Sequence, residues 1–240
     1  MRLLDGKVAL VTGAALGLGN AFARALAAEG AQLSVCDVRD EVMELSGAIG
    51  KQVLTMKADV SKAEDVRRVV DTTKQELGRI DVLVNNHGAG VKIAKTEDQD
   101  DAAIAEALET NLASVIKGCR EVVPYMKKQK SGLIVNVSSA CAYHSWPNWG
   151  VYTAAKAGVV GFTRCLHLEM LEWGGRATNF IPGAARTNFC KAAKVDDSWL
   201  EGFPSAHDFA RCIVQCIDTP DNCFIEEVSI WGVKQVISPF

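Results

Sequence analysis

The chain is 240 residues long, enough for one or two domains, and its 48% hydrophobic and 23% charged residues exclude a disordered or collagen-like polymer. The 26 lysines and arginines nearly balance the 29 acidic residues, for a formal net charge of −3, so no basic surface for nucleic acid is indicated. No apolar run approaches the roughly 20 residues of a membrane span, and the charges within residues 1–7 do not fit a signal peptide.

The eight cysteines show no spacing typical of a disulfide framework. Cys212 and Cys216 are one helical turn apart with Cys223 nearby, but no histidine or acidic partner completes a usual zinc spacing. We therefore expect free thiols, no bound metal and a cytoplasmic protein.

Short apolar runs alternate with helical stretches along the chain. The expected strands are residues 8–11, 32–36, 53–56, 81–84, 133–137, 177–181 and 224–230. The expected helices are residues 18–29, a polar segment ending near 49, 62–77, 101–130 with a kink at Pro124, 151–173 and 206–217. The inner strands are continuous apolar runs, as expected where helices cover both faces. This order predicts a single α/β domain over residues 1–240, a doubly wound parallel sheet of about seven strands.

A glycine-rich segment, residues 12–19, lies between the first strand and the first helix with the spacing G-x-x-x-G-x-G. One glycine permits a tight turn, another lets the backbone approach a pyrophosphate, and the last allows close packing of helix on strand. The helix N-terminus adds N–H donors for phosphate. The residues predicted to contact a dinucleotide here are Gly13, Ala15, Leu16, Gly17, Leu18 and Gly19.

Asp37 ends the second strand, eighteen residues after Gly19, where a carboxylate can accept hydrogen bonds from the adenosine ribose. Such a carboxylate repels the 2′-phosphate of NADP, and the turn offers no cation to hold that phosphate. The sequence therefore favours NAD over NADP, with Asp37 and Val38 at the adenosine end. Arg39 is the nearby cation that weakens this preference.

Tyr152 and Lys156 open the helix after the fifth strand, and their spacing of four places both on one helical face. A tyrosine with an ordinary pKa near ~10 is a poor base at neutral pH, but a neighbouring ammonium lowers that pKa. Ser138 and Ser139 stand at the carboxyl end of the preceding strand, the edge where open α/β sheets bind ligands.

Taken together, these motifs resemble the short-chain dehydrogenase/reductase family over residues 7 to about 187. The matching features are Thr12-Gly13 to Gly19, Ala58-Asp59-Val60, Asn85-Asn86-x-Gly88, Asn111, Ser138-Ser139, Tyr152-x-x-x-Lys156 and Pro182-Gly183-x-x-x-Thr187. Their common order along the chain makes the resemblance specific. It implies a Rossmann-type fold, a nicotinamide cofactor and a homodimer or homotetramer.

The resemblance also implies roles for individual residues. Tyr152 is the general acid/base, Lys156 lowers its pKa and binds the nicotinamide ribose, Ser139 holds the substrate oxygen, and Asn111 places a water in a proton relay. Ser138 ranks behind Ser139 as its structural neighbour. The remaining implied cofactor contacts are Asp59, Val60, Asn86, Gly88, Ile181, Pro182, Gly183 and Thr187.

Two features depart from the family pattern. His87 stands where the family usually has alanine, and we expect its side chain to be packed or solvated rather than in contact with substrate. The C-terminal segment, residues 218–230, lacks the usual family ending, so subunit contacts made there do not follow from the resemblance.

Substrate selection in this family depends on two stretches, here residues 141–150 and about 184–205. Their aromatic and histidine side chains could form the wall of an apolar pocket, or could pack under the loop or against another subunit. The predicted substrate contacts are Ser139, His144, Trp146, Trp149, Phe189 and Trp199. A bulky apolar alcohol or ketone, such as a steroid, lipid or terpenoid, is the expected substrate.

Three functions remain open on the sequence. The first is an NAD-dependent alcohol dehydrogenase or carbonyl reductase, with an NADP-dependent carbonyl reductase as its variant. The second is a non-catalytic NAD-binding sensor or scaffold, which the complete set of Asn111, Ser139, Tyr152 and Lys156 disfavours. The third is an epimerase or dehydratase of the extended relatives, which usually carry a further substrate domain that residues 1–240 do not accommodate.

Overall fold

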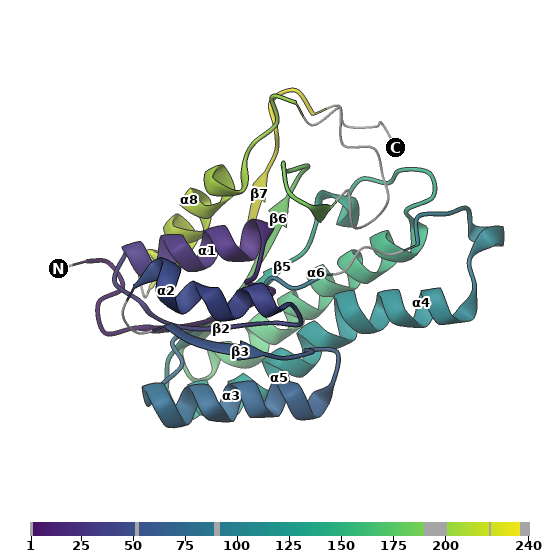
Figure 1. Ribbon diagram of the computed structural model, residues 1–240. Helices are drawn as coiled ribbons and strands as arrows, with labels where there is room; N and C mark the ends of the chain where they lie inside the picture. The colour runs from purple at the N-terminus through teal and green to yellow at the C-terminus, as the bar shows by residue number, and fades with distance from the viewer. Residues whose placement is uncertain (1, 51–52, 89–91, 190–200, 221, 236–240) are drawn as a thin grey trace.

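Seven parallel strands form one sheet in the order β3-β2-β1-β4-β5-β6-β7 (Figure 1). The computed structural model describes residues 2–50, 53–88, 92–189, 201–220 and 222–235. The strands are β1 (Val8–Thr12), β2 (Gln32–Asp37), β3 (Val53–Lys57), β4 (Val82–Asn85), β5 (Gly132–Val137), β6 (Gly175–Pro182) and β7 (Glu227–Ile230). The chain runs outward from β1 to β3 and then returns to β4 beside β1, so a topological switch point lies between β1 and β4.

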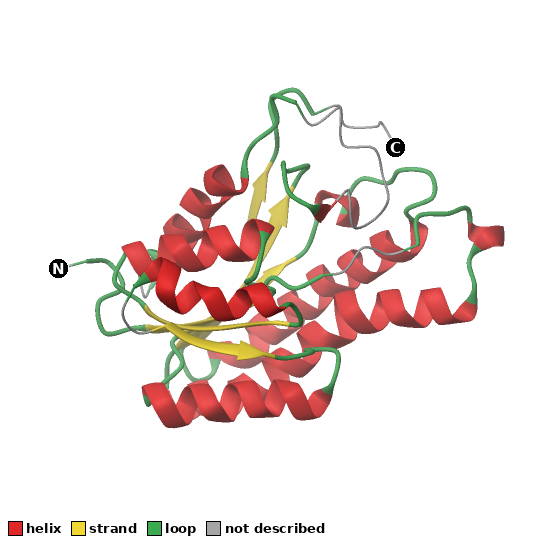
Figure 2. Cartoon of the chain, viewed as in Figure 1, coloured by secondary structure: helices red, strands yellow, loops and turns green. Residues whose placement is uncertain are grey.

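Helices cover both faces of this sheet (Figure 2). One face carries α1 (Gly17–Ala28), the short α2 (Leu45–Ile49) and α8 (Ala206–Ile217). The other carries α3 (Ala63–Leu77), α5 (Ser114–Gln129) and α6 (Gly150–Leu171), with α4 (Asp101–Leu108) leading into α5. The doubly wound parallel architecture expected from the sequence is confirmed.

Each face of the sheet has its own hydrophobic core. On the α1 and α8 face, Phe22 and Phe180 meet edge to face with ring centroids 5.4 Å apart, and Phe209 of α8 is fully buried. On the other face, Met126 and Met170 pack against the sheet. These two cores fix the helices against the sheet, and so fix the carboxyl edge from which the loops emerge.

Local signals explain where the helices begin and end. Gly78, with a φ of +77°, ends α3 in the left-handed conformation and donates its N–H to the Lys74 carbonyl. Ser205 and Asp208 form a reciprocal capping box at the start of α8. Within the described part of the chain, no helix combines the length and apolar character that crossing a membrane requires.

Three elements differ from the sequence-based expectation. The polar segment before residue 49 is a 3₁₀ turn, η1 (Asp40–Glu44), followed by the five-residue α2, in which Gly47 disfavours a longer helix. The expected helix over 101–130 stays continuous through Pro124 but is interrupted by a π-helical turn, η3 (Glu109–Ala113). β7 begins at Glu227 rather than at residue 224.

The late start of β7 has a visible cause. The Arg176 guanidinium donates to the Cys223 carbonyl, and the Thr178 hydroxyl donates to the Ile225 carbonyl. Side chains of β6 therefore bind backbone groups that would otherwise pair in a ladder, and regular pairing begins two residues later.

Candidate active site

The glycine-rich turn between β1 and α1 leaves no room for side chains at its key positions. A Cβ at Gly13 would lie 2.7 Å from the His87 Cα, and one at Gly19 would lie 2.1 Å from the Gly13 carbonyl oxygen. Gly13 and Gly17 also have φ values of +65° and +59°. Among the residues that the structure describes, no side chain caps the start of α1, so its first N–H groups are not bound by one. The arrangement suits the backbone recognition of a pyrophosphate predicted for this segment.

The residues around the turn hold it from two sides. The Asn86 side chain donates to the carbonyls of Thr12 and Gly13, at 3.2 and 3.0 Å. Thr187 approaches from the loop after β6, with its Cβ 3.5 Å from where a Gly17 Cβ would be. The predicted nicotinamide side of the site, which includes Pro182 and Gly183 at the end of β6, therefore adjoins the glycine turn.

The Asp37 carboxylate lies against the same turn. One oxygen accepts the Ala15 N–H at 3.0 Å, and the other accepts the Arg39 N–H at 3.1 Å. Val38 beside it is 53% exposed. The structure thus places a half-buried negative charge next to the glycine-rich turn that is predicted to bind phosphate.

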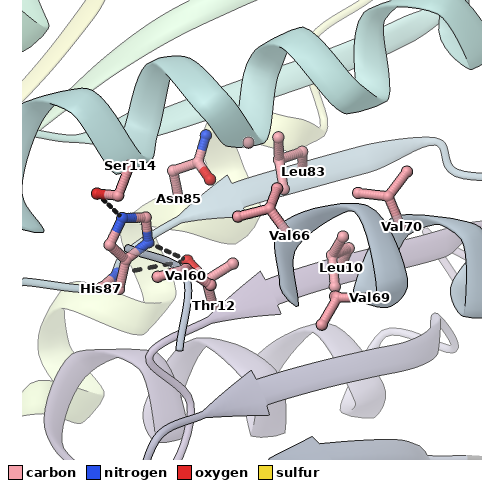
Figure 3. A pocket seen from close by; sticks show the side chains of 11 residues that line it. Leu10, Thr12, Val60, Val66, Val69, Val70, Leu83, Asn85, His87 and Ser114 are labelled. Carbon is pink, nitrogen blue, oxygen red and sulfur yellow. Dashed lines mark hydrogen bonds between the residues drawn. The ribbon is translucent and has the colours of Figure 1, made fainter. Parts of the chain in front are cut away.

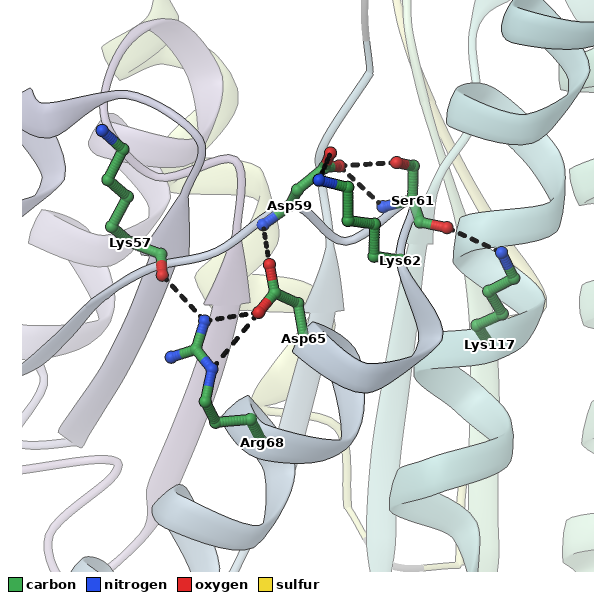
Figure 4. Close-up of polar contacts among 7 residues, drawn as sticks. All are labelled: Lys57, Asp59, Ser61, Lys62, Asp65, Arg68 and Lys117. Atoms are coloured by element: carbon green, nitrogen blue, oxygen red, sulfur yellow. Dashed lines mark hydrogen bonds and ion pairs between the residues drawn. The ribbon is translucent and has the colours of Figure 1, made fainter.

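The loop after β3 is fixed by a network of polar contacts, in which Asp59 takes part through both its backbone and its side chain (Figure 4). Asp65 accepts the Asp59 N–H at 2.8 Å and is itself bound by Arg68, while Lys117 donates to the Ser61 carbonyl at 2.7 Å. A hydrogen bond from the Ser61 hydroxyl is the main reason that the pKa of Asp59 is lowered. The neighbouring Val60 lines a small cavity between β1, β4, α3 and α5.

Tyr152 and Lys156 are both buried on the first turns of α6. The Lys156 ammonium lies 5.8 Å from the centroid of the Tyr152 ring and donates to the Val137 carbonyl at 3.0 Å. Among the described residues no carboxylate pairs with it. Burial lowers the pKa of Lys156 to about 8. An ammonium without a partner carboxylate is therefore held beside a phenol.

The two serines after β5 have different surroundings. The Ser138 hydroxyl is buried and donates to the Lys156 carbonyl at 2.8 Å, which ties β5 to α6. Ser139 is half-buried at the edge and accepts the Cys141 N–H at 3.2 Å, so its own proton is available for donation. This difference agrees with the ranking of Ser139 over Ser138 as the residue facing substrate.

Asn111 lies in the π-helical turn η3. Its amide nitrogen donates to the Ala107 carbonyl at 3.0 Å, while its buried Oδ1 has no hydrogen-bond partner among the described residues. A Cβ at Gly88 would lie 3.0 Å from this Oδ1 and 3.7 Å from the Lys156 ammonium. The backbone at Gly88 therefore runs close to both Asn111 and Lys156.

A row of three asparagines crosses the sheet beneath the site. The sequence motifs assign these three residues no functional role. Asn85, Asn136 and Asn179 are register partners on β4, β5 and β6. Asn85 donates to Asn136 at 2.9 Å, Asn136 donates to Thr163 of α6 at 2.9 Å, and Asn179 donates to the Val160 carbonyl at 3.4 Å. The row fixes the helix that carries Tyr152, and its only sequence signal is a buried amide in each apolar strand.

Several predicted substrate side chains gather around Tyr152. The Trp149 ring meets the Tyr152 ring edge to face at 5.6 Å, and the Phe189 ring lies 5.6 Å from Tyr152 and 6.4 Å from Trp149. Trp146 is half-buried in the same stretch, and Trp199 lies outside the described residues.

The other aromatic residues of the 141–150 stretch pair with the C-terminal part of the chain. The His144 ring meets the Trp231 ring edge to face at 5.0 Å, a neighbour that sequence reasoning missed. The Tyr143 hydroxyl donates to Glu227 of β7 and accepts from Arg164 at 3.2 Å, so Tyr143 is bound to the last strand.

A family model described as short chain dehydrogenase matches residues 7–197. The chain belongs to the short-chain dehydrogenase/reductase family. It is 40% identical over 187 residues to the levodione reductase of Leifsonia aquatica, an alignment covering 75% of this chain and 70% of that relative. As a member of this family, the protein is an oxidoreductase.

Solved structures agree on the fold. The 3-ketoacyl-(acyl-carrier-protein) reductase of Brucella melitensis, complexed with NADH, superposes with a TM-score of 0.89 at 27% identity, covering 97% of this chain and 100% of that chain. The alcohol dehydrogenase of Thermococcus sibiricus, complexed with 5-hydroxy-NADP, gives 0.86 at 26% identity, covering 97% and 99%. Binding of a nicotinamide dinucleotide is thus expected of this short-chain dehydrogenase/reductase, while both kinds of cofactor occur among its neighbours.

The residues present fit such a cofactor. A Cβ at Gly13 or Gly19 would meet neighbouring atoms at less than 3 Å, so the close-packed backbone of the turn requires glycine there, and a carboxylate, Asp37, adjoins the turn. Lys156 supplies a buried ammonium. The Val137 carbonyl accepts one of its three N–H groups, and the others can donate to a ligand. No metal-binding group of three or more His, Cys, Asp or Glu residues occurs in the described ranges, and the cysteines described there are free.

Proposed function

We propose that this protein interconverts a secondary alcohol and a ketone with NAD(H), and that Tyr152 acts as the general acid/base. The observation that carries the proposal is the buried ammonium of Lys156, which lies 5.8 Å from the Tyr152 ring with no carboxylate partner among the described residues. A buried positive charge there favours the phenolate form of the tyrosine, which is the form needed to accept a proton.

The surrounding residues divide the remaining tasks. Ser139 donates its hydroxyl proton to the substrate oxygen, so that this oxygen is held within reach of the Tyr152 hydroxyl. In oxidation, Tyr152 accepts the proton of the alcohol, and in reduction it donates that proton back. Asn111 places a water that links Lys156 to solvent, so that protons move between Tyr152 and solvent through Lys156 and this water. The position of the Asn111 Oδ1 and the Lys156 ammonium on the same side of Gly88 supports this role.

The dinucleotide, when bound, supplies or accepts the hydride. Gly13, Gly17 and Gly19 bind its pyrophosphate through the backbone, and Asp37 binds the adenosine ribose, an arrangement that favours NAD because the carboxylate repels a 2′-phosphate. Val38 flanks the ribose, and Asp59 with Val60 flanks the adenine. NADP is the alternative cofactor, because Arg39, next to Val38 in the sequence, is a cation that could bind a 2′-phosphate.

A bulky apolar substrate is supported by the aromatic surroundings of Tyr152. Trp149 and Phe189 present ring faces and edges to it, which suits a hydrocarbon skeleton better than a charged one. The name of the levodione reductase relative also points to a carbonyl substrate. His144, Trp146 and Trp199 complete the proposed substrate contacts, and a homodimer or homotetramer remains the expected assembly.

Replacing Tyr152 by phenylalanine tests the proposal. Tyr152→Phe keeps the ring but removes the acid/base, so turnover of a reactive ketone or alcohol should fall by about 10²–10⁴-fold or more. The affinity for NAD, measured by titration calorimetry, should change less than about threefold. Tyr125→Phe is the matched control, because Tyr125 is a partly buried tyrosine of α5 whose hydroxyl donates to Asp71 at 2.7 Å. Full activity in Tyr152→Phe would refute the assignment, and NAD binding without any turnover in the unmodified protein would favour the non-catalytic sensor.

A further inference from the structure

His87 is buried at the centre of the site's polar contacts. It lies two residues after the end of β4, the residue is 7% exposed, and its ring bridges two hydroxyls (Figure 3). Its Nδ1 lies 2.7 Å from the Thr12 Oγ1 at the end of β1, and its Nε2 lies 2.6 Å from the Ser114 Oγ at the start of α5. The side chain is therefore packed, one of the two outcomes expected from the sequence, and it connects elements that alanine could not connect.

The hydrogen bonds around His87 have one consistent direction. The Ser114 hydroxyl donates its single proton to the Thr110 carbonyl at 2.6 Å, so it must accept a proton from the imidazole. The Nε2–H therefore donates to Ser114, which leaves Nδ1 of a neutral ring as an acceptor. The Thr12 hydroxyl lies 2.7 Å from this Nδ1 and 3.3 Å from the Val84 carbonyl, so the shorter contact to His87 is the one that its single proton serves. Burial, with a smaller contribution from Lys156, lowers the pKa of His87 to about 3, while Asp59 opposes that shift. The imidazole is thus neutral at physiological pH.

The last bond of this chain ends inside the π-helical turn. Thr110 lies in η3, one residue before Asn111, and the carbonyls of a π-helical turn do not follow the regular α-helical pairing. Ser114 binds one of these carbonyls, and His87 binds Ser114. The geometry of the turn that presents Asn111 is therefore tied to β1 through a single imidazole.

The backbone at residues 87 and 88 also lies between the glycine-rich turn and the residues Asn111 and Lys156. The His87 Cα would be 2.7 Å from a Gly13 Cβ, so it packs on the phosphate-binding turn. One residue later, Gly88 packs against Asn111 and Lys156. His87 thus lies between the turn proposed to bind the dinucleotide and the two residues proposed for the proton relay, Asn111 and Lys156.

We infer that His87 is a positioning residue, which holds the π-helical turn so that Asn111 is placed against Gly88 and Lys156. The inference rests on the proposed function, because it assigns His87 a role through the Asn111 relay. His87 stands where the family usually carries alanine. An alanine side chain cannot hydrogen-bond, so the connection from Thr12 of β1 to Ser114 depends on this histidine.

The test is a double-mutant cycle between His87 and Asn111. His87→Ala alone should lower kcat by about 10- to 100-fold, since misplacement of a relay group by about 1 Å is enough for such a loss. Because the relay acts on proton movement, the loss should depend on pH, and the KM for NAD should change less than about threefold. In an Asn111→Ala background, His87→Ala should cause little further loss, since it acts through a group already removed.

Two further variants separate positioning from general destabilisation. Ser114→Ala should reproduce the kcat loss of His87→Ala, and Ser114→Thr, which keeps the hydroxyl, should restore most of it. His167→Ala is the matched control, because His167 is a buried histidine of α6 that accepts the Ala177 N–H away from Asn111. It should lower thermal stability with no pH-dependent loss of kcat.

A spectroscopic measurement tests the connection independently of turnover. Imidazole ¹⁵N shifts of His87 should report the neutral tautomer protonated at Nε2 near pH 7, and Ser114→Ala should change the Nε2 shift. Unchanged kcat in folded His87→Ala at every pH, additive losses with Asn111→Ala, or the other tautomer would each overturn the inference. Measuring Tyr152→Phe in parallel separates the two proposals, because an active Tyr152→Phe contradicts the acid/base assignment whatever His87 does.

Discussion

At the β1–α1 turn the site is made of backbone, whereas on α6 and η3 it is made of buried side chains. The turn can be this closely packed because Gly13 and Gly19 have no side chains. A Cβ added at either position would lie less than 3 Å from neighbouring atoms. On α6, by contrast, Lys156 presents a charge that burial makes costly, and Asn111 presents a buried amide oxygen. The first region is limited by space and the second by electrostatics, so the two should fail in different ways when altered.

Adding a methyl group to the turn should have the largest effect. Gly19→Ala would place a carbon 2.1 Å from the Gly13 carbonyl, so the turn must open and phosphate hydrogen bonds must be lost. Two such bonds correspond to about 3–6 kcal/mol, so affinity for NAD should fall by at least about 100-fold in calorimetric titration. Gly161→Ala is the control, because this glycine of α6 has no atom within 4 Å of its added carbon and should gain about 1 kcal/mol of stability. Equal NAD affinities in the two variants would contradict the steric account.

Removing the charge of Lys156 should separate stability from activity. The pKa of Lys156 is about 8 in the folded protein, against 10.5 for an ordinary lysine, so between these values the unfolded chain binds more protons and stability rises with pH. Lys156→Met lacks this rise, and at pH 7 it should be more stable than the wild type by an amount on the order of 3 kcal/mol, while losing activity. Urea unfolding at pH 7, 9 and 10.5 measures the difference, which should shrink towards high pH. If Lys156→Met were no more stable than the wild type at pH 7, burial of the ammonium would not be costly.

Changing the charge beside the turn should have the smallest effect of the three. Asp37→Ala together with Val38→Arg removes the repulsion of a 2′-phosphate and adds a cation at a position that is 53% exposed. The ratio of kcat/KM for NAD to that for NADP should fall by about 10- to 100-fold, corresponding to about 1.4–2.8 kcal/mol. Val38→Arg alone provides the control for the added cation. If the unmodified protein already prefers NADP, the interpretation of Asp37 is wrong.

The sequence predicts those parts of the molecule that depend on residue types at fixed spacing. The glycine turn, the Tyr152 and Lys156 pair and the parallel sheet lie where they were expected, because each depends on local geometry or on strand order. The substrate side chains were harder to assign. Trp149 and Phe189 do meet Tyr152, whereas Tyr143 from the same stretch is bound to Glu227.

The remaining features depend on contacts between distant parts of the chain. The partners of His87 lie 75 and 27 residues away, so the sequence identifies the departure from alanine without indicating what the ring binds. The π-helical turn at residues 109–113 contains Thr110 and Asn111, which have low helix propensity, but no residue in it specifies a π-helical turn rather than an α-helical one. The pairing of His144 with Trp231 likewise joins two segments whose proximity follows only from the fold.

The asparagine row has a consequence for strand register. Asn85, Asn136 and Asn179 all bond on the sheet face that α5 and α6 cover, and side chains alternate between faces along each strand. A slip of one residue in β4, β5 or β6 would turn its amide towards the α1 and α8 face, where the core is hydrophobic and offers it no partner. Each amide thus penalises a mispaired sheet, so the row favours the register that aligns the strands carrying the site.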